Sequence, residues 1–376
     1  MREENEQQPV ICSECGAVLT EQTASVFGED IYCSDCLERL TTTCDCCGRR
    51  ILRCDAESDG CIMLCRHCYE YSYTRCEGCG CIISNDEANY VDGDDYPYCD
   101  ECYRKIEEEP IKSYGYKPEP IFYGSGNLFY GVELEIDKGG ERCDYAEEIL
   151  NTANAHNLHL YAKHDGSIDD GFELVSHPMT LEYHTNTMNW SGVMDMALSL
   201  NYRSHQTQTC RLHIHVNRKA FGNDYDTQED SISRIVHFVE MHWNELLKFS
   251  RRTEANMNRW ASRYGISTTA KDTYKNSKAK HCGRYVAINL ENYSTIEFRI
   301  FRGTLRYKTF LATLQLVDEI CNLTIKLSDR ELEGMSWSDF VIQIDSKNKP
   351  ELIEYLKARR LYVNEPVAVS AETEGE

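Results

Sequence analysis

The stretch FYGVELEID, residues Phe129–Asp137, alternates apolar and acidic residues in the pattern of a β-strand. Its apolar residues alternate with Glu133 and Glu135. Because successive side chains of a strand point to opposite faces, the apolar residues line one face and the two carboxylates lie side by side on the other. Adjacent anions repel each other unless something positive lies over them. The stretch therefore predicts a strand with one buried face and one face that needs a cation.

Three further segments share this pattern: CRLHIHVN (210–217), GFELVSHP (171–178) and STIEFRIFRGT (294–304). The residues expected on their polar faces are Arg211, His213, His215, Asn217, Glu173, Thr295, Glu297, Arg299 and Phe301. Each pair alone is common on a solvated strand, so the argument is the coincidence of four such strands within about 170 residues. Carboxylates with few imidazoles suit Mg²⁺ or Mn²⁺, and arginines suit phosphate oxygens. Together they are typical of phosphoryl transfer.

The first third of the chain repeats a pair of Cys-x2-Cys motifs three times, with a period of 32 residues. The three sets are Cys12, Cys15, Cys33 and Cys36; Cys44, Cys47, Cys65 and Cys68; and Cys76, Cys79, Cys99 and Cys102. Four thiolates in two pairs are what a closed tetrahedral zinc site requires. Units of about 30 residues are too small to fold on apolar burial alone. We therefore expect three structural Zn²⁺ in zinc-ribbon or LIM-like units at about 12–36, 44–68 and 76–102.

Four other cysteines lie outside the repeat, and disulfides or a redox relay are the competing interpretations of this region. The four are Cys46, Cys54, Cys61 and Cys81. Cys54 and Cys61 are able to replace ligands of the second set, and the sequence does not decide between these arrangements. Since a closed site has no open coordination position, the zinc ions are expected to be structural. We expect this region to recruit a partner or substrate.

Charge and hydropathy limit the class of protein. The net charge is −22, and residues 1–110 carry 25 acidic against 9 basic residues. A domain of this sign repels phosphate backbones, so nucleic-acid binding is not expected. No run of about 18 apolar residues occurs, and the first ten residues have no apolar signal-peptide core, so we expect a cytoplasmic protein with reduced thiols.

The composition changes after the cysteine-rich region, residues 1–106. Residues 107–121 contain prolines and glycines without periodicity and are predicted to be a linker. Apolar residues at helical spacing predict core-facing helices over 231–250 and 308–327. The segment 331–364 is expected to be a helical extension, with a helix opening at Pro350, and the acidic tail 365–376 is expected to be disordered. The scattered residues Cys143, Cys210, Cys282 and Cys321 are interpreted as ordinary thiols.

Taken together, the motifs resemble those of the amidoligase family, in the superfamily of glutamine synthetase and glutamate–cysteine ligase. The matching segments are GVELEI, KHDGSI followed by FELVSHP, RLHIHVN, SRRTEANMNRW and GRYVAINLENYSTIEFRIFRGTL, over roughly residues 122–330. The family is common in bacteriophage genomes. The resemblance implies an α+β fold with a curved antiparallel sheet and packed helices, which holds ATP and two or three Mg²⁺. It also implies formation of an amide through an acyl phosphate, although neither the carboxylate nor the amine substrate can be identified from it.

The resemblance also implies roles for individual residues. Glu133, Glu135, Glu173, His213 and Glu297 match metal-binding and catalytic positions, with His215 as the second choice of histidine. By the same match, Arg299 stabilises phosphate, Arg284 and Arg302 are further oxyanion contacts, and Asp165 binds metal or the amine. Arg211 stands where the family often has a small residue, which is a departure from the pattern. No G-x-x-x-x-G-K-[ST] loop occurs, which excludes a P-loop enzyme.

Two alternatives come from other classes of protein. His213 and His215 also resemble the histidine pair of metal-dependent enzymes that nick DNA, with Tyr274 as nucleophile and Lys278 beside it. That interpretation leaves Glu133, Glu135, Glu297 and Arg299 unexplained. The second alternative is a non-catalytic zinc-binding scaffold, against which the retained set of polar residues argues.

Overall fold

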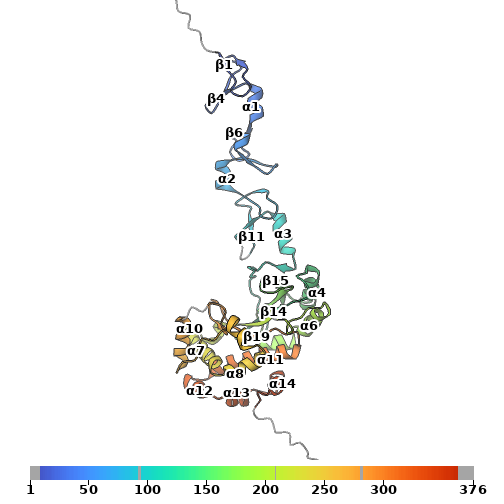
Figure 1. Ribbon diagram of the computed structural model, residues 1–376, viewed down its shortest axis with the longest axis vertical. Coiled ribbons are helices and arrows are strands. Elements are labelled where there is room, and N and C mark those ends of the chain that lie inside the picture. The colour runs from blue at the N-terminus through green and yellow to red at the C-terminus, as the bar shows by residue number, and fades with distance from the viewer. Residues whose placement is uncertain (1–8, 92–94, 208, 280–282, 363–376) are drawn as a thin grey trace, which may run out of the picture. The chain divides into compact units, whose positions relative to one another are not determined.

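The computed structural model describes residues 9–91, 95–207, 209–279 and 283–362. The chain divides into two compact units, Met1–Glu108 and Glu109–Glu376, which Figure 1 shows in colour by residue number. The acidic tail 365–376 and Cys282, about which the sequence made predictions, lie outside the described residues. In the described part of the chain, no helix has the length and apolar character needed to cross a membrane.

The first unit contains three copies of one small motif, in which two hairpins are followed by a helix. The first copy consists of β1 (Val10–Ile11), β2 (Val18–Leu19), β3 (Ser25–Phe27), β4 (Asp30–Tyr32) and α1 (Ser34–Leu40). The second consists of β5 (Thr41–Thr43), β6 (Arg50–Leu52), the 3-10 turn η1 (Arg53–Asp55), β7 (Ala56–Ser58), β8 (Met63–Cys65) and α2 (Arg66–Ser72). The third consists of β9 (Tyr73–Arg75), β10 (Ile82–Ser84), β11 (Asn89–Tyr90), β12 (Pro97–Tyr98) and α3 (Asp100–Glu108). The repeat predicted from the cysteine spacing is confirmed.

Glycine makes the sharp turn after the first cysteine pair of each copy. Gly16, Gly48 and Gly80 have φ angles of 72°, 71° and 74°, in the left-handed region that glycine adopts without steric cost. The apolar clusters of this unit are small and consist partly of cysteine side chains. Burial of this extent does not stabilise a fold by itself, so the unit needs another source of stability.

A seven-stranded sheet forms the centre of the second unit, in the order β13-β15-β16-β14-β17-β19-β18. Its strands are β13 (Ile111–Lys112), β14 (Tyr130–Ile136), β15 (Leu160–Lys163), β16 (Phe172–Ser176), β17 (Arg211–Asn217), β18 (Ile288–Asn289) and β19 (Thr295–Arg302). All neighbouring strands pair antiparallel except β13 and β15, which are parallel. The α+β class is therefore confirmed, whereas a wholly antiparallel sheet was wrong. The specific likeness to glutamine synthetase stays an expectation.

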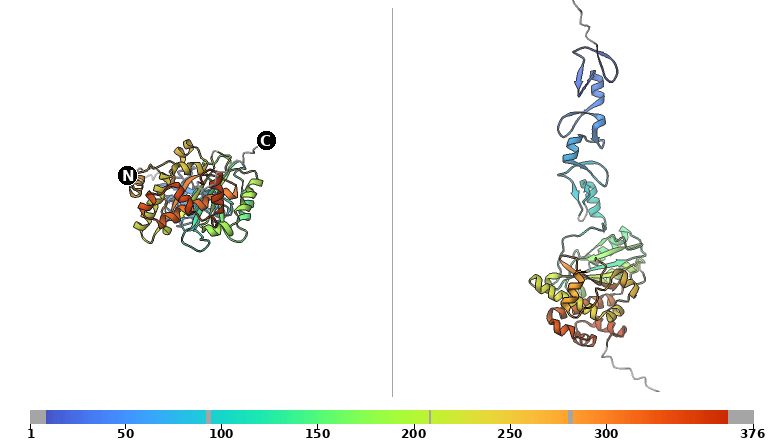
Figure 2. Two further views of the ribbon diagram at one scale, coloured as in Figure 1. Left: turned by 90° about the horizontal axis from the view of Figure 1, so that it is seen from below. Right: turned by 60° about the vertical axis from the view of Figure 1, so that its left-hand side comes forward.

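Helices cover one side of this sheet, as the views in Figures 1 and 2 show. They are α4 (Cys143–Ala153), α5 (Leu181–Asn186), α6 (Trp190–Ser199), the 3-10 helix η2 (Arg218–Phe221), α7 (Tyr225–Met241), α8 (Trp243–Ser250), α9 (Glu254–Trp260), α10 (Ala270–Ala279), α11 (Tyr307–Lys326), α12 (Asp329–Glu333), α13 (Trp337–Gln343) and α14 (Pro350–Ala358). The helix predicted over 231–250 is interrupted at His242, which ends α7 and precedes α8. The helix predicted over 308–327 is present as α11.

The apolar sides of the central strands and the long helix α11 form the core. Leu134, Ile214 and Phe298 are completely buried, as are most residues of α11. The Tyr130 hydroxyl donates a 2.7 Å hydrogen bond to Asp318 of α11, which fixes the helix over β14. The predicted alternation therefore holds, because its apolar residues all face this core.

Two features of the sheet differ from the sequence-based expectation. Ile111–Lys112, inside the segment predicted to be a linker, forms the edge strand β13. In addition, the register of β17 and β19 shifts between Leu212 and Ile214, so Phe301 lies opposite Leu212 in the core. Phe301 was expected beside Glu297 on the polar face, but this β-bulge changes the alternation. The same shift places Arg302 opposite Arg211.

We predict that Ile214→Ala lowers the free energy of unfolding of the second unit by about 2–5 kcal/mol, because it leaves a cavity in a completely buried position. All four tryptophans lie between residues 190 and 337, so tryptophan fluorescence in a urea titration reports this unit alone. The control is Ile342→Ala, at a side chain that is 60% exposed, with an expected change within about 0.5 kcal/mol. Equal effects of the two substitutions would contradict the described core.

Candidate metal centres

Each of the three copies of the small motif in the first unit, called a finger below, brings four cysteine sulfurs into one cluster. The sulfur atoms within each cluster lie within 4.8 Å of one another. The three clusters are Cys12, Cys15, Cys33 and Cys36; Cys44, Cys47, Cys65 and Cys68; and Cys76, Cys79, Cys99 and Cys102. All cysteines in the described part of the chain are free thiols, which does not support the disulfide alternative. These clusters have the donor set of a closed tetrahedral zinc site.

The backbone around the sulfurs favours thiolates. Hydrogen bonds from the backbone N–H groups of Cys15 and Cys33 lower the pKa of Cys12 to about 6. Cys33 and Cys65 also cap α1 and α2, since their sulfurs accept from the N–H groups three residues later. Capping residues placed in this way join the metal site to the start of the helix. Loss of the metal is therefore expected to weaken the helices as well.

The four cysteines outside the repeat have different surroundings. Cys46, Cys54 and Cys61 are exposed, whereas Cys81 is half-buried with its sulfur 3.3 Å from that of Cys79. The predicted set Cys44, Cys47, Cys65 and Cys68 comes together without Cys54 or Cys61. In the second unit, Cys210 and Cys321 are buried and Cys143 is exposed, as expected of ordinary thiols.

A second group of potential ligands covers the polar face of the large sheet. It comprises Glu133 and Glu135 of β14, Glu173 of β16, His213 and His215 of β17, and Glu297 and Arg299 of β19, and is called the polar cluster below. The strands that carry it are neighbours in the sheet, although their sequences are up to about 160 residues apart. The structure therefore brings together the residues that the four alternating segments predicted for one face.

Glu133 lies at the centre of the polar cluster. Its two carboxylate oxygens are each 3.1 Å from a histidine nitrogen, His213 Nδ1 and His215 Nε2. It belongs to two groups whose ligand atoms lie within 4.8 Å of one another, one with His215 and Glu297 and the other with Glu173 and His213. Two cation positions that share one carboxylate are thus available.

Unequal surroundings shift the pKa values of the carboxylates in opposite directions. Burial opposes ionisation of Glu133, but the two histidines outweigh it and hold its pKa well below the ordinary value. Burial, with the charges of Glu133 and Glu135, raises the pKa of Glu173 well above the ordinary value. Burial also raises the pKa of Glu135, despite His213 and Arg211 nearby. With all four glutamates ionised and the histidines neutral, the face would carry more negative charge than Arg211 and Arg299 offset, which favours a divalent cation.

Arginine and asparagine side chains support the carboxylates. The backbone N–H of Arg211 donates to Glu135 Oε2 at 2.7 Å, and its guanidinium lies 3.5 Å from Oε1. Arg299 is hydrogen-bonded to Glu297, which also accepts from the amide of Asn289 at 2.8 Å. Glu135 and Glu297 are thereby held in fixed orientations.

Two buried polar atoms on this face, His213 Nε2 and Arg299 Nε, have no partner, and Glu135 Oε1 and His215 Nε2 have only the ion-pair contacts given above. His213 Nδ1 faces carboxylate oxygens of Glu133 and Glu297 at 3.1 and 3.4 Å. A proton on Nδ1 is therefore favoured, which leaves the lone pair of Nε2 available. Metal-binding histidines in proteins usually donate their other N–H to a carboxylate in this manner. The residues present fit Mg²⁺ or Mn²⁺, because unsatisfied buried donors and acceptors of this kind need a ligand.

The remaining predicted residues lie around the polar cluster. Asp165 is half-buried in a turn, where its carboxylate accepts from the N–H of Ser167. Arg302 donates to the carbonyl oxygen of Thr207 and borders a cavity of about 360 Å³ with Arg211. Arg284 is exposed, and it donates to the hydroxyl groups of Tyr114 and Tyr285 rather than to a carboxylate of the cluster.

Sequence reasoning missed three polar neighbours of the cluster. Lys163 lies opposite Glu173 across β15 and β16, and Asn289 is the short-strand partner of Glu297. Arg252 is buried and donates to the carbonyl oxygen of Arg299 at 2.8 Å. Lys163 occupies an outward position in a strand that alternates buried and half-buried residues, so the sequence pattern could have identified it. Asn289 and Arg252 follow no periodicity, so only the tertiary structure identifies them.

Comparisons with known proteins add little to this description. No family model matches the chain, and no curated protein matches it. Among solved structures, it is similar to "Crystal structure of a bifunctional glutathione synthetase from Pasteurella multocida", with a TM-score of 0.36 and 12% sequence identity. The alignment covers 62% of this chain and 46% of that protein, so the chain spans less than half of its length. A likeness of this size carries no argument about function.

We predict that the full chain binds three Zn²⁺ and that Cys12→Ser reduces the zinc content by one, because each cluster supplies four sulfurs to one ion. Removal of zinc by a strong chelator should unfold the first unit, seen as increased amide hydrogen exchange, and leave tryptophan fluorescence of the second unit unchanged. Retention of all three ions in Cys12→Ser, or protection of the first unit without zinc, would contradict the assignment. The control is Cys143→Ser, at an exposed thiol outside the clusters.

We predict that Mn²⁺ binds the zinc-saturated chain more tightly as the pH rises. Glu173 has a raised pKa, and His215 has a pKa of about 9 because Glu133 and Glu297 outweigh the effect of burial. A raised pKa favours the protonated form of each group, and a cation must displace that proton, so affinity should increase by about tenfold per pH unit for each displaced proton. Electron paramagnetic resonance titrations measure it. An affinity that is constant or falls with rising pH would contradict this account.

Proposed function

We propose that the second unit is an ATP- and Mg²⁺-dependent carboxylate–amine ligase. The observation that carries the proposal is the convergence of carboxylates, histidines and arginines from four neighbouring strands on one sheet face. The resemblance of the same segments to the amidoligase family supports it. The proposal includes a cytoplasmic location, since zinc sites made of four cysteines require reduced thiols.

In the proposed reaction, a carboxylate oxygen attacks the γ-phosphorus of ATP and ADP leaves. The nitrogen of an amine then attacks the acyl carbon, phosphate leaves, and the nitrogen loses a proton. Mg²⁺ supplies Lewis-acid stabilisation of the phosphate charge. Among the protein groups, Glu133, His213 and Glu297 are placed to hold cations, and Arg299 is placed to stabilise phosphate oxygens. A buried carboxylate such as Glu173 is suited to move the proton of the amine.

The DNA-nicking alternative is not favoured by the surroundings of Tyr274. This residue is buried on α10, and its hydroxyl donates to Glu229 at 2.6 Å, with Lys278 bound to the same carboxylate. Burial and Glu229 raise the pKa of Tyr274 to about 12, which opposes formation of a nucleophilic phenolate. His213 and His215 contact carboxylates of the polar cluster instead.

The non-catalytic scaffold remains the second candidate for the first unit alone. Its four-cysteine clusters have no open position, so a role in recruiting a protein partner or substrate is proposed for it. The polar cluster argues against such a role for the whole chain. Buried unpaired polar atoms lower the stability of a fold, and their presence is typical of a functional site.

We predict that phosphate is released from ATP and Mg²⁺ in the presence of a suitable pair of substrates, found by screening carboxylates with amines and amino acids. Glu135→Gln should lower the turnover by about 100-fold or more, since it removes one charge from a completely buried position in the cluster.

The matched control is Glu147→Gln, at an exposed glutamate of α4 outside the cluster, which should keep the turnover. Zinc content should be unchanged in both variants, because the cysteine clusters belong to the other unit. Unchanged turnover in Glu135→Gln would count against the assigned site. Nicking of single-stranded DNA without ATP would favour the rival enzyme.

A further inference from the structure

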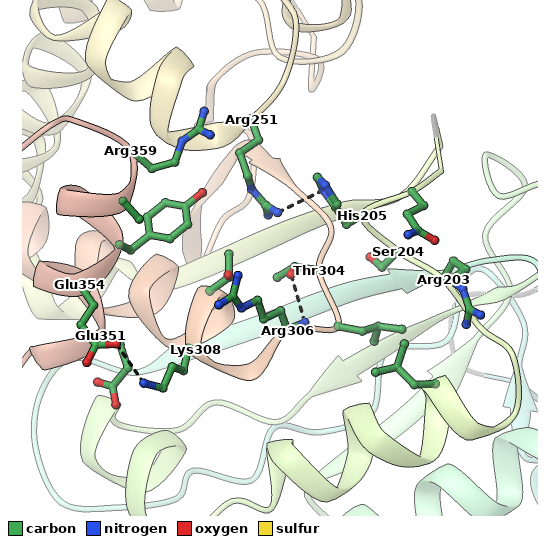
Figure 3. A pocket seen from close by; sticks show the side chains of 16 residues that line it. Arg203, Ser204, His205, Arg251, Thr304, Arg306, Lys308, Glu351, Glu354 and Arg359 are labelled. Atoms are coloured by element: carbon green, nitrogen blue, oxygen red, sulfur yellow. Dashed lines mark hydrogen bonds and ion pairs between the residues drawn. The ribbon is translucent and has the colours of Figure 1, made fainter.

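A second cavity of the ligase unit, of about 670 Å³, lies where β17 begins and β19 ends, and is called the Arg251 pocket below. Its walls come from the segment before β17, the end of α8, the start of α11 and the helix α14. Figure 3 shows Arg251 and Arg306 directed toward one space from two different elements, with Arg359 at its edge beside α8. Arg251 and Thr304 belong to segments that resemble the amidoligases, whereas α14 lies outside residues 122–330.

Positive charge is concentrated in this pocket, although the chain has a net charge of −22. The charged residues that line it are Arg203, Arg251, Arg306, Lys308, Arg359, Glu351 and Glu354. Lys308 is paired with Glu354 at 3.0 Å, and Glu351 accepts from Gln315. Among the described residues, no carboxylate forms an ion pair with any of the four arginines. The pocket therefore holds cations without matching anions.

Arg251 ends α8, and one nitrogen of its side chain lacks a hydrogen-bond partner. It follows α8 with a φ angle of 62°, in the left-handed region that non-glycine residues seldom adopt. Its Nε is buried without a hydrogen-bond partner. Burial, together with the charges of Arg302, Arg359 and Arg306, lowers the pKa of Arg251. Its Nη1 and Nη2 atoms donate to His205 Nδ1 and to the carbonyl oxygen of Arg302 at 3.1 and 3.4 Å, so Nε is the donor of this guanidinium group that is left for a ligand.

The start of α11 adds a second attraction for anions. Arg306 is the N-cap of this 20-residue helix, its side chain makes no capping hydrogen bond, and the first turn contains no acidic residue. Lys308 and Thr309 of that turn line the pocket. A helix N-terminus favours negative charge and is a poor position for an arginine. An oxyanion in the pocket would bind both the guanidinium group and the free N–H groups.

Helix packing explains only part of this group of arginines in the Arg251 pocket. Arg359 donates to the carbonyl oxygen of Lys248 at 2.6 Å and so joins α14 to α8. The Arg306 side chain, in contrast, is exposed and has no hydrogen bond or ion pair to a described residue. Arg306 and the free Nε of Arg251 therefore have no packing role that accounts for them.

We propose that the Arg251 pocket binds a small ligand that carries two or more oxyanion groups, either carboxylates or phosphates. Guanidinium groups bind both kinds of oxyanion through paired hydrogen bonds. The cavity volume lies within the range of small-ligand sites. This site is separate from the polar cluster, and its occupation does not depend on the ligase reaction.

Calorimetric titration of the zinc-saturated full chain in magnesium-free buffer tests the proposal, with the peptide triglutamate and inorganic tripolyphosphate as separate probes. At least one probe should bind saturably, and Arg306→Gln should weaken it by about tenfold, because one charge-assisted contact is lost. Removal of a cation from the N-cap of α11 should not destabilise the fold, which tryptophan fluorescence checks. Arg330→Gln, on α12 outside the pocket lining, is the matched control and should bind normally.

The two probes distinguish the source of the oxyanion: binding of triglutamate alone indicates a carboxylate ligand, and binding of tripolyphosphate alone a phosphate ligand. Glu135→Gln should keep this binding even if it abolishes turnover, so failure of the ligase proposal leaves this one intact. The proposal is overturned if neither probe binds saturably, if Arg306→Gln and Arg251→Gln bind as well as the unmodified chain, or if Glu135→Gln loses the binding.

Discussion

Electrostatic repulsion within a buried face is the constraint on which the second unit depends. Glu135, Glu173 and Glu297 are each less than 5% exposed, and Glu133 lies between them. Burial of several carboxylates is costly unless each has a partner or a proton. The sheet meets this cost with two histidines, two arginines and a raised pKa of Glu173, and it leaves His213 Nε2 and Arg299 Nε without partners. The tolerance of this arrangement in an otherwise well-packed unit argues for a cation-binding function.

The two units reach stability by different physical means. The second has one large apolar core between the sheet and helices such as α11. The first has only small clusters, and the sulfur sets occupy the positions that a core would fill. Each finger is therefore a local structure that metal binding completes. Small hairpins and helices of this kind could not support the polar cluster, because a rigid sheet is needed to hold ligands from distant segments.

Much of this organisation was predictable from the sequence because it depends on periodicity. The cysteine period fixed the three clusters, and the alternation around Glu133 and His213 identified the polar face before any pairing of strands was known. Features set by tertiary context were not predictable. The bulge that moves Phe301 into the core depends on pairing with β17, and the parallel strand Ile111–Lys112 lies in a segment whose composition favours a linker. Arg252 is buried only through the tertiary structure, and no pattern in the sequence around it predicts this burial.

The register shift between β17 and β19 determines which side chains of β19 reach the polar face. It lets one strand present Glu297 and Arg299 to the polar face and then Arg302 to the same face after changing phase. A regular register of all these residues, without the bulge, would instead place Phe301 opposite Arg211 and turn Arg302 toward the core. The composition of the polar face is therefore set by the pairing of the two strands as well as by their charged residues.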